Sequence, residues 1–239
     1  MARRFVVNGS FNVGEDIKIL GDEARHIMVL RHNVGDEILV NDKICKIKNI
    51  TKQDVLCTVI GKAEEKGVPK TKITLFQALL KSDKMEFVIQ KAVELGVHEV
   101  VPFSSKNVVV KLDEKYKIKK HERWNKISVE ASKQCGRSDI VEVMRVCDFN
   151  EMLDKLNDFD IVIIAYENEK RELKEVIKEK YNAKKIAIII GAEGGFDKSE
   201  VEKVLEKNNA SSVSLGNRIL RAETASLNLI SILMYEFEM

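Results

Sequence analysis

The spacing of hydrophobic positions along this 239-residue chain changes near residue 70. Before that point the apolar residues come in short, partly alternating runs, and turn signals such as Asn8-Gly9 and Gly35-Asp36 separate them. This spacing predicts β-strands, with one helix over about residues 22–30. So many short strands in such a length predict a small β-barrel. The expected strands are Phe5–Val7, Asp16–Leu20, Glu37–Val40, Ile44–Ile47 and Val55–Ile60.

From Ile73 onward, apolar runs alternate with amphipathic segments at helical spacing. This alternation predicts an α/β fold with a largely parallel sheet. One helix is expected to begin near Asp83 and to end at Gly96, and another carries Trp124. The proline-bearing segment Gly67–Lys70 is the linker candidate, so we expect domains over residues 1–70 and 71–239. The expected strands are Ile73–Leu80, Val100–Phe103, Ile161–Tyr166, Ile186–Ile190 and Val213–Leu215.

A glycine-rich loop, residues 191–195, directly follows one of these strands and holds three of the chain's 12 glycines. Glycine is used where backbone turns tightly or approaches another group closely, and α/β sheets build ligand sites at the carboxyl ends of strands. The loop matches neither the GxGxxG fingerprint nor a phosphate-binding P-loop. Glu193 fits a ligand with a cationic or hydrogen-bond-donating part better than a phosphate. The alternative is an ordinary strand-to-helix turn.

The polar segment Asn217–Thr224 opens an otherwise apolar helix. It is either a helix cap with Arg–Glu pairing or a polar site at a helix start, where backbone N–H groups are free. Glu130, Gln134 and Arg137 form a further polar group, which is either a solvated helix face or functional.

A small basic patch is predicted in the first part of the chain. Arg25, His26 and Arg31 lie close together in the sequence, and Arg3 and Arg4 would add to them. Such a patch is compatible with contacts to phosphate groups.

The composition of the chain excludes few of these functional interpretations. The chain has 40 basic and 38 acidic residues, so any bound nucleic acid must be met by a local pattern of charge. No leader peptide or membrane span is expected. The four cysteines lack CxxC spacing, which favours structural thiols in a reducing compartment and predicts no metal site. No nucleophilic triad can be assigned, so the chemistry would depend on a bound cosubstrate.

Residues that match one known family are spread over nearly the full length. They are Arg3-Arg4-Phe5, His26, Leu30-Arg31, Gly35-Asp36, Lys81, Lys84-Met85-Glu86, Gln90-Lys91, Gly96, Arg123-Trp124, Glu130, Gln134, Arg137, Gly191–Phe196 and Leu215–Ala225. On these residues the chain resembles the bacterial 16S ribosomal RNA (uracil-N3) methyltransferases, RsmE type, of the SPOUT superfamily. Ala192 stands where that family usually has proline.

The resemblance implies a PUA-like β-barrel over residues 1–70 and an α/β methyltransferase domain with a trefoil knot over residues 71–239. It also implies a homodimer in the cytoplasm that binds S-adenosyl-L-methionine in the knot and acts on 16S rRNA or the 30S ribosomal subunit. The cofactor-binding residues would be Ala165, Tyr166, Glu167, Gly191, Ala192, Glu193, Gly194, Gly195, Leu215, Gly216, Ile219, Leu220, Arg221, Thr224 and Ala225.

The implied reaction methylates N3 of a uridine, which carries a proton at neutral pH and is a poor nucleophile. The site must accept that proton or stabilise the resulting anion. Arg137 and Arg221 are the candidates for charge stabilisation, and Glu130 or Glu223 is the candidate base.

The target base must also leave its stack to reach the methyl group. The expected RNA-binding residues are Arg3, Arg4, Arg25, His26 and Arg31, which would contact phosphates. The alternatives are a non-catalytic RNA-binding assembly factor and a nucleotide-binding α/β enzyme. The missing phosphate-loop fingerprints disfavour the second of these.

Overall fold

The computed structural model describes residues 4–81, 83–108, 113–180 and 182–238. The chain divides into two compact units. The first extends to Val68 and includes Ser132–Ile140, whereas the second contains Pro69–Ala131 and the rest of the chain from Val141. The sequence did not predict that a segment from the middle of the chain would join the first unit. The domain boundary at residue 70 therefore stays a proposal.

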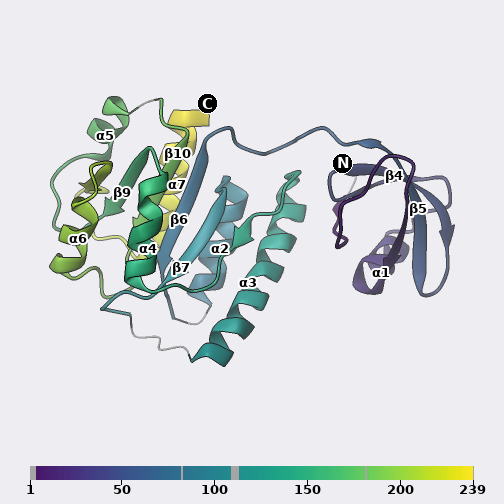
Figure 1. Cartoon of the computed structure of the whole chain (residues 1–239), viewed down its shortest axis with the longest axis horizontal. Coiled ribbons are helices and arrows are strands. Elements are labelled where there is room, and N and C mark those ends of the chain that lie inside the picture. Colours follow the sequence, from purple (N-terminus) through teal and green to yellow (C-terminus); the bar gives the residue numbers. More distant parts are fainter. Residues whose placement is uncertain (1–3, 82, 109–112, 181, 239) are drawn as a thin grey trace. The chain divides into compact units, whose positions relative to one another are not determined.

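The first unit is built on a five-stranded mixed sheet that forms half a barrel (Figure 1). Its strands are β1 (Arg4–Phe5), β2 (Asp16–Leu20), β3 (Glu37–Val40), β4 (Lys43–Ile50) and β5 (Asp54–Lys62), in the order β1-β3-β4-β5-β2. Only the β1–β3 pair is parallel. The predicted alternation is confirmed in β2, where Ile17 and Ile19 are buried and Asp16, Lys18 and Leu20 are exposed. Helix α1 (Gly21–Val29) packs Ala24 and Ile27 into the same core.

The second unit contains a six-stranded sheet in which every strand pair is parallel. Its strands are β6 (Lys72–Ala78), β7 (Glu99–Phe103), β8 (Glu142–Val143), β9 (Ile161–Ala165), β10 (Lys185–Ile190) and β11 (Ala210–Val213), in the order β11-β9-β10-β6-β7-β8. The predicted α/β fold is confirmed. Sequence analysis missed β8, because two residues show no periodicity. A trefoil knot is defined by the loop through which the chain threads. The order of the strands does not establish this threading, so the expected knot stays a prediction.

Successive residues of the buried strands point to opposite sides of this sheet, so both of its faces are hydrophobic. Helices cover both faces. Ile186, Ile188 and Ile190 of β10 join one hydrophobic cluster, and Ala187 and Ile189 join another. The first cluster contains residues of α2 (Lys84–Leu95), α3 (Glu114–Cys135), α5 (Leu173–Glu179) and α7 (Ala222–Glu238). The second contains residues of α4 (Phe149–Lys155), the 3₁₀ turn η1 (Leu156–Asp158) and α6 (Lys198–Leu205).

Local sequence signals explain how α2 is placed. Met85, Ile89 and Val93 lie on its buried face, as the helical spacing predicts. The helix ends at Gly96, which has a φ of 104° and so adopts the left-handed conformation that glycine favours.

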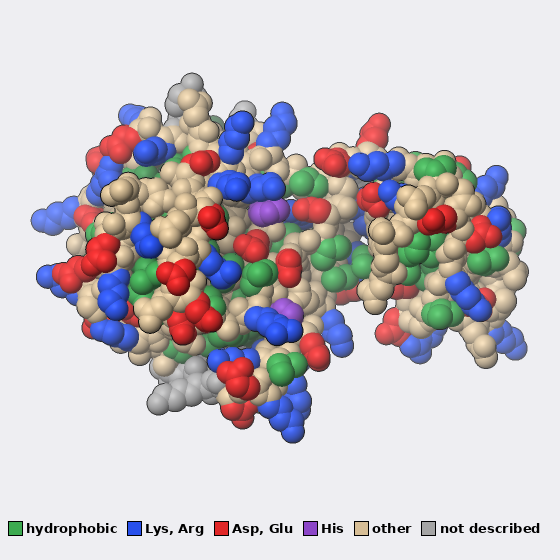
Figure 2. All heavy atoms as spheres, viewed as in Figure 1, with side chains coloured by type: hydrophobic (Ala, Val, Ile, Leu, Met, Phe, Trp, Pro, Cys, Tyr) green, Lys and Arg blue, Asp and Glu red, His purple; other side chains and the backbone are tan. Residues whose placement is uncertain are grey.

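The surface carries charges of both signs. Figure 2 shows Lys and Arg side chains interspersed with Asp and Glu over the visible face. Within the described residues, no helix is long and apolar enough to cross a membrane.

Candidate functional site

A cavity of about 750 Å³ lies at the carboxyl ends of β9, β10 and β11. Three loops line it, and they come from residues 165–169, 190–196 and 214–225. This volume is in the range that small-molecule sites occupy, and the edge of the sheet is the one where parallel α/β folds bind ligands. The structure therefore brings together three segments, each about 20 residues from the next in the sequence.

All predicted cofactor residues except Thr224 line this cavity. Thr224 lies on the first turn of α7 and is exposed. Sequence analysis missed several lining residues, most of which are neighbours of predicted ones. They are Lys84, Glu169, Ile190, Phe196, Ser214, Asn217, Arg218 and Ala222. Lys84, which belongs to the family pattern, reaches the cavity from a different element, α2.

The glycines of the loop after β10 are needed because other chain segments come close to them. A Cβ on Gly195 would lie 2.7 Å from Oε1 of Glu167, and Gly195 has a φ of 66°. A Cβ on Gly191 would lie 3.2 Å from the ring of Phe196. The Gly195 N–H donates to the carbonyl oxygen of Ala192 over 3.0 Å, which closes the turn. The bare backbone of this loop is therefore held in one shape against the wall of the cavity.

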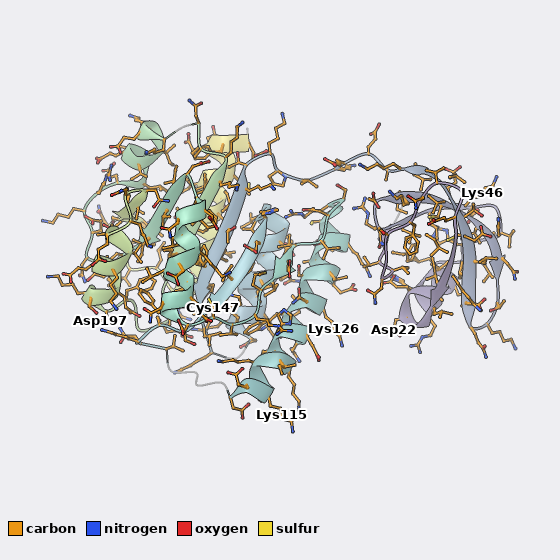
Figure 3. All side chains as sticks on the ribbon, viewed as in Figure 1. Asp22, Lys46, Lys115, Lys126, Cys147 and Asp197 are labelled. Atoms are coloured by element: carbon orange, nitrogen blue, oxygen red, sulfur yellow. The ribbon has the colours of Figure 1, made fainter. Side chains whose placement is uncertain are left out.

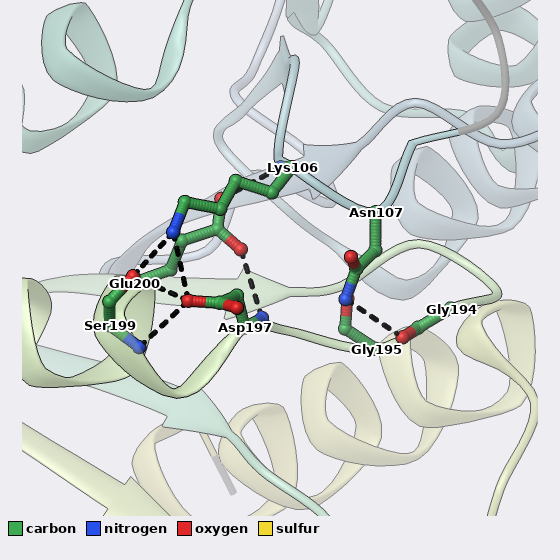
Figure 4. Close-up of polar contacts among 7 residues, drawn as sticks. All are labelled: Lys106, Asn107, Gly194, Gly195, Asp197, Ser199 and Glu200. Carbon is green, nitrogen blue, oxygen red and sulfur yellow. Dashed lines mark hydrogen bonds and ion pairs between the residues drawn. The ribbon is translucent and has the colours of Figure 1, made fainter.

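Asn107, in the loop after β7, supports the glycine loop from outside. Its side-chain amide donates to the carbonyl oxygens of Gly194 (3.2 Å) and Gly195 (3.4 Å) (Figure 4). A Cβ on Gly194 would lie only 3.1 Å from that of Asn107. The sequence carried no signal for this contact.

The start of α6, where Asp197 lies (Figure 3), is fastened to the same β7 loop. The Lys106 ammonium contacts Asp197 at 2.9 Å, and the Lys106 N–H donates to Glu200 at 2.9 Å. Asp197 and Glu200 also form a capping box. Hydrogen bonds from the Ser199 hydroxyl, the Lys106 ammonium and the Ser199 N–H lower the pKa of Asp197 to about 2. The carboxylate is therefore charged over the whole neutral range.

A buried polar contact lies behind the cavity. Gln77 of β6 is fully buried, and its amide nitrogen donates to the carbonyl oxygen of Gly191 over 3.3 Å. Its Oε1 accepts from the Ser226 hydroxyl of α7 at 2.5 Å, with the carbonyl oxygen of Ala222 2.9 Å from that hydroxyl. These contacts connect β6, the glycine loop and the first turns of α7.

Charged side chains lie at the cavity and beside it. The Lys84 ammonium is 3.3 Å from Oε1 of Glu193 and 3.8 Å from Oε2 of Glu223. Burial raises the pKa of Glu193, but hydrogen bonds from backbone N–H groups and from Lys84 outweigh it and lower that pKa. Oε2 of Glu223 is buried and has no hydrogen-bond donor among the described residues. Arg221 lines the cavity, is exposed and forms no ion pair within the described part of the chain.

Three of the four predicted catalytic residues, Glu130, Arg137 and Glu223, do not line this cavity. Glu130 lies on α3 and is exposed. Arg137 belongs to the first compact unit and is only 3% exposed. Its guanidinium contacts the Asp139 carboxylate at 2.8 Å and 2.9 Å. Their catalytic roles stay predictions.

The predicted RNA-binding residues of the first unit have different surroundings. Arg25 and Arg31 are exposed, and Arg25 pairs with Asp22. The ring of His26 packs edge-on against Phe5 at 5.8 Å. Arg4 is partly buried and donates to the carbonyl oxygen of Arg137, and burial lowers its pKa. Arg3 lies outside the described residues. All of these RNA contacts stay predictions.

Among the described residues, no group of three or more His, Cys, Asp or Glu side chains is placed to hold a metal ion. The four cysteines are free thiols.

Comparison with known proteins identifies relatives over nearly the whole chain. An RNA methyltransferase domain model matches residues 66–234. The ribosomal RNA small subunit methyltransferase E of Bacillus subtilis is 36% identical, over 92% of this chain and 90% of that protein. The protein of the same name from Aquifex aeolicus is 32% identical, over 89% and 91% of the two chains.

Solved structures agree with these sequence matches. The ribosomal RNA small subunit methyltransferase E of Neisseria gonorrhoeae, bound to S-adenosyl methionine, gives a TM-score of 0.86 at 28% identity, over 98% of this chain and 97% of that one. A Legionella pneumophila methyltransferase in complex with bound SAM gives 0.85 at 27% identity, over 98% of each chain.

The parallel sheet with three loops around one cavity is the catalytic unit of an RNA methyltransferase of the SPOUT type. Within that class, the chain belongs to the ribosomal RNA small subunit methyltransferase E family.

Proposed function

We propose that this chain transfers a methyl group from S-adenosyl-L-methionine to N3 of a uridine in 16S rRNA of the small ribosomal subunit. The observation that carries the proposal is the cavity at the ends of β9, β10 and β11, in which three loops converge around glycine backbone. Two relatives of the same fold over nearly the whole chain have S-adenosyl methionine bound.

The residues present fit this cofactor. Gly191, Gly194 and Gly195 leave backbone uncovered where a side chain would collide with Phe196, Asn107 or Glu167. Such a surface suits a ligand that is held largely by main-chain groups. When bound, S-adenosyl-L-methionine supplies the methyl group, and its sulfur keeps the electron pair of the broken bond.

The chain must then make N3 of uridine reactive. We assign Oε2 of Glu223 to accept the N3 proton, because this oxygen has no hydrogen-bond donor among the described residues. We assign the Arg221 guanidinium to the negative charge that develops on O2 and O4, because it lines the cavity without an ion-pair partner in the described residues. Glu130 and Arg137 are the second choice for the same two roles, since neither lines the cavity, whereas Glu223 lies 3.8 Å from Lys84, which does.

A homodimer and a cytoplasmic location belong to the same proposal. Helices α2 and α7 pack against each other and leave Phe87 and Tyr235 exposed, by 45% and 66%. Exposed aromatic side chains of this kind are enriched at protein interfaces. The location follows from the substrate, since ribosomal RNA is found in the cytoplasm of bacteria. Light scattering of the purified protein would decide its oligomeric state.

Arg221→Ala tests the proposed reaction. Tritiated methyl transfer to 30S subunits that lack the modification should fall by roughly 100-fold or more, as for loss of a group that stabilises charge in the transition state. Affinity for S-adenosyl-L-methionine, measured by calorimetry, should change only a few-fold. The control Arg145→Ala removes an exposed arginine outside the cavity and should retain full activity.

Unchanged turnover in Arg221→Ala would contradict the role of that residue. If the unmodified chain binds S-adenosyl-L-methionine but transfers no methyl group to 30S subunits or to 16S rRNA, the non-catalytic assembly factor becomes the better description.

A further inference from the structure

The first half of α3 carries a local excess of positive charge that the chain as a whole does not have. Between residues 114 and 126 there are six Lys or Arg residues and two Glu residues, a net charge of +4, against +2 for all 239 residues. In the first unit, which holds every predicted RNA contact, helix α1 has one arginine against two acidic residues and is not comparably basic. This region therefore has the local charge pattern that a nucleic-acid partner requires.

Helical geometry places three of these lysines on one side. Lys115, Lys119 and Lys126 are separated by four and seven residues, which aligns them along the helix. The opposite side of α3 is buried through Trp124, Ser128 and Ala131. Figure 3 labels Lys115 and Lys126 on this helix. The three lysines therefore point away from the core of the second unit.

In the part of the chain that the structure describes, no ion pair is formed by Lys115, Lys119 or Lys126. Lys117, by contrast, pairs with Glu114 at 2.7 Å. Lys115, Lys119 and Lys126 therefore present their full charge to solvent, where phosphate groups can contact it.

An exposed aromatic side chain lies beside the row. Tyr116 is 53% exposed and is three residues before Lys119 on the helix. Unpaired RNA bases stack on aromatic rings of this kind, while lysines contact the phosphates. We call Lys115, Tyr116, Lys119 and Lys126 the basic face of α3.

Ion pairs connect α3 to the element that reaches the cavity. Glu86, in the first turn of α2, accepts Arg123 of α3 at 2.6 Å and 2.7 Å, and Lys120 lies 3.5 Å from it. Hydrogen bonds from Arg123 lower the pKa of Glu86, so the pair is charged at neutral pH. Lys84, two residues earlier on α2, lines the cavity. The basic face is thus fixed relative to the cavity through the start of α2.

We propose that the basic face of α3 binds a strand of the substrate RNA, with its three lysines on phosphates and Tyr116 against a base. The proposal rests on the proposed function, because it takes small-subunit rRNA as the substrate. It adds an RNA-binding surface in the catalytic unit to the contacts expected from the first unit.

The test replaces Lys115, Lys119 and Lys126 together with alanine, which preserves the helix. The matched control replaces Lys178, Lys180 and Lys203, which are exposed lysines of α5, its end and α6, so that both variants lose three positive charges. The affinity of each protein for in-vitro-transcribed 16S rRNA is measured between 50 and 200 mM salt, conditions over which phosphate contacts are resolved.

The basic-face variant should bind RNA at least about tenfold more weakly, and its log–log salt slope should fall by about 2, the value for three phosphate contacts to a single strand. Its affinity for S-adenosyl-L-methionine should match that of the unmodified protein. Tyr116→Ala should weaken RNA binding roughly fivefold, and Tyr116→Phe should restore it, because the ring is retained.

An equal loss of RNA affinity in the basic-face variant and in the control would overturn the proposal. A Tyr116→Phe variant that binds RNA no more tightly than Tyr116→Ala would also overturn it. Failure of the proposed function gives a different result. In that case the unmodified protein transfers no methyl group, while the comparison of salt slopes still decides whether the basic face contacts RNA.

Discussion

The Ser226 hydroxyl donates a hydrogen bond of 2.5 Å to Oε1 of Gln77, and both side chains are fully buried. Ser226→Ala leaves that amide oxygen without a donor inside the protein. We expect it to lower the free energy of unfolding by about 1–3 kcal/mol, the cost of an unsatisfied buried polar group. Urea denaturation at neutral pH measures this loss.

Ser105→Ala is the matched control for Ser226→Ala. The Ser105 hydroxyl is buried and has no hydrogen-bond partner among the described residues. Removing this hydroxyl should lower the free energy of unfolding by less than about 0.5 kcal/mol, or should raise it. Equal losses in the two variants would contradict the structural role of the Gln77–Ser226 contact.

Gly195→Ala should weaken binding of S-adenosyl-L-methionine by about tenfold or more. The new Cβ would lie 2.7 Å from Oε1 of Glu167, so the Glu167 side chain must move within the cavity. The positive φ of Gly195 adds about 1 kcal/mol of backbone strain. Calorimetric titration with S-adenosyl-L-methionine reports the affinity.

Two further variants distinguish the steric collision with Glu167 from the backbone strain at Gly195. Adding Glu167→Ala to Gly195→Ala removes the colliding carboxylate and should recover part of the affinity. Gly14→Ala introduces the same kind of strain at a φ of 93°, with nothing within 4 Å of the new Cβ, and should not affect the cofactor. No recovery in the double variant would show that strain alone is responsible.

Lowering the pH should reduce the free energy of unfolding, because the Asp197 carboxylate becomes protonated. Its pKa of about 2 lies below the value of about 3.9 expected for an unfolded chain. A depressed pKa in the folded state contributes stability above pH 4, and this contribution is lost as the pH falls from about 4 to about 2. Asp197→Asn keeps an oxygen at the helix start but cannot ionise.

The free energies of unfolding of the two proteins, measured by urea titration, should therefore differ by a constant amount above about pH 5. The difference should shrink toward pH 2. Lys106→Ala removes one of the groups that lower this pKa and should make the pH dependence shallower. A difference that stays constant down to pH 2 would contradict the assignment.

Local patterns predicted most of the strands, and the resemblance to a known family implied most of the residues around the cavity. Alternation in β2 and the end of α2 at Gly96 are properties of a few neighbouring residues. The glycine loop could be recognised in the same way, since tight turns and close approaches require glycine itself.

The contacts that support the cavity could not be predicted in this way. Gln77 contacts a carbonyl oxygen 114 residues later in the chain, and Asn107 contacts one 87 residues later. No periodicity or spacing records such pairs, because they exist only after the sheet has formed. Arg137 shows the same limit, since its burial against Asp139 depends on a segment that joins the first compact unit.

Residues 214–225 are the last of the three cavity segments along the chain, and Ser226 follows them directly. A ribosome delivers the chain from its amino-terminal end, so the other two loops emerge before the third wall exists. A growing polypeptide therefore has no complete binding site until the start of α7 has left the exit tunnel and packed against β6. Each newly made molecule can hold its small-molecule partner only after residues 214–226 have been synthesised.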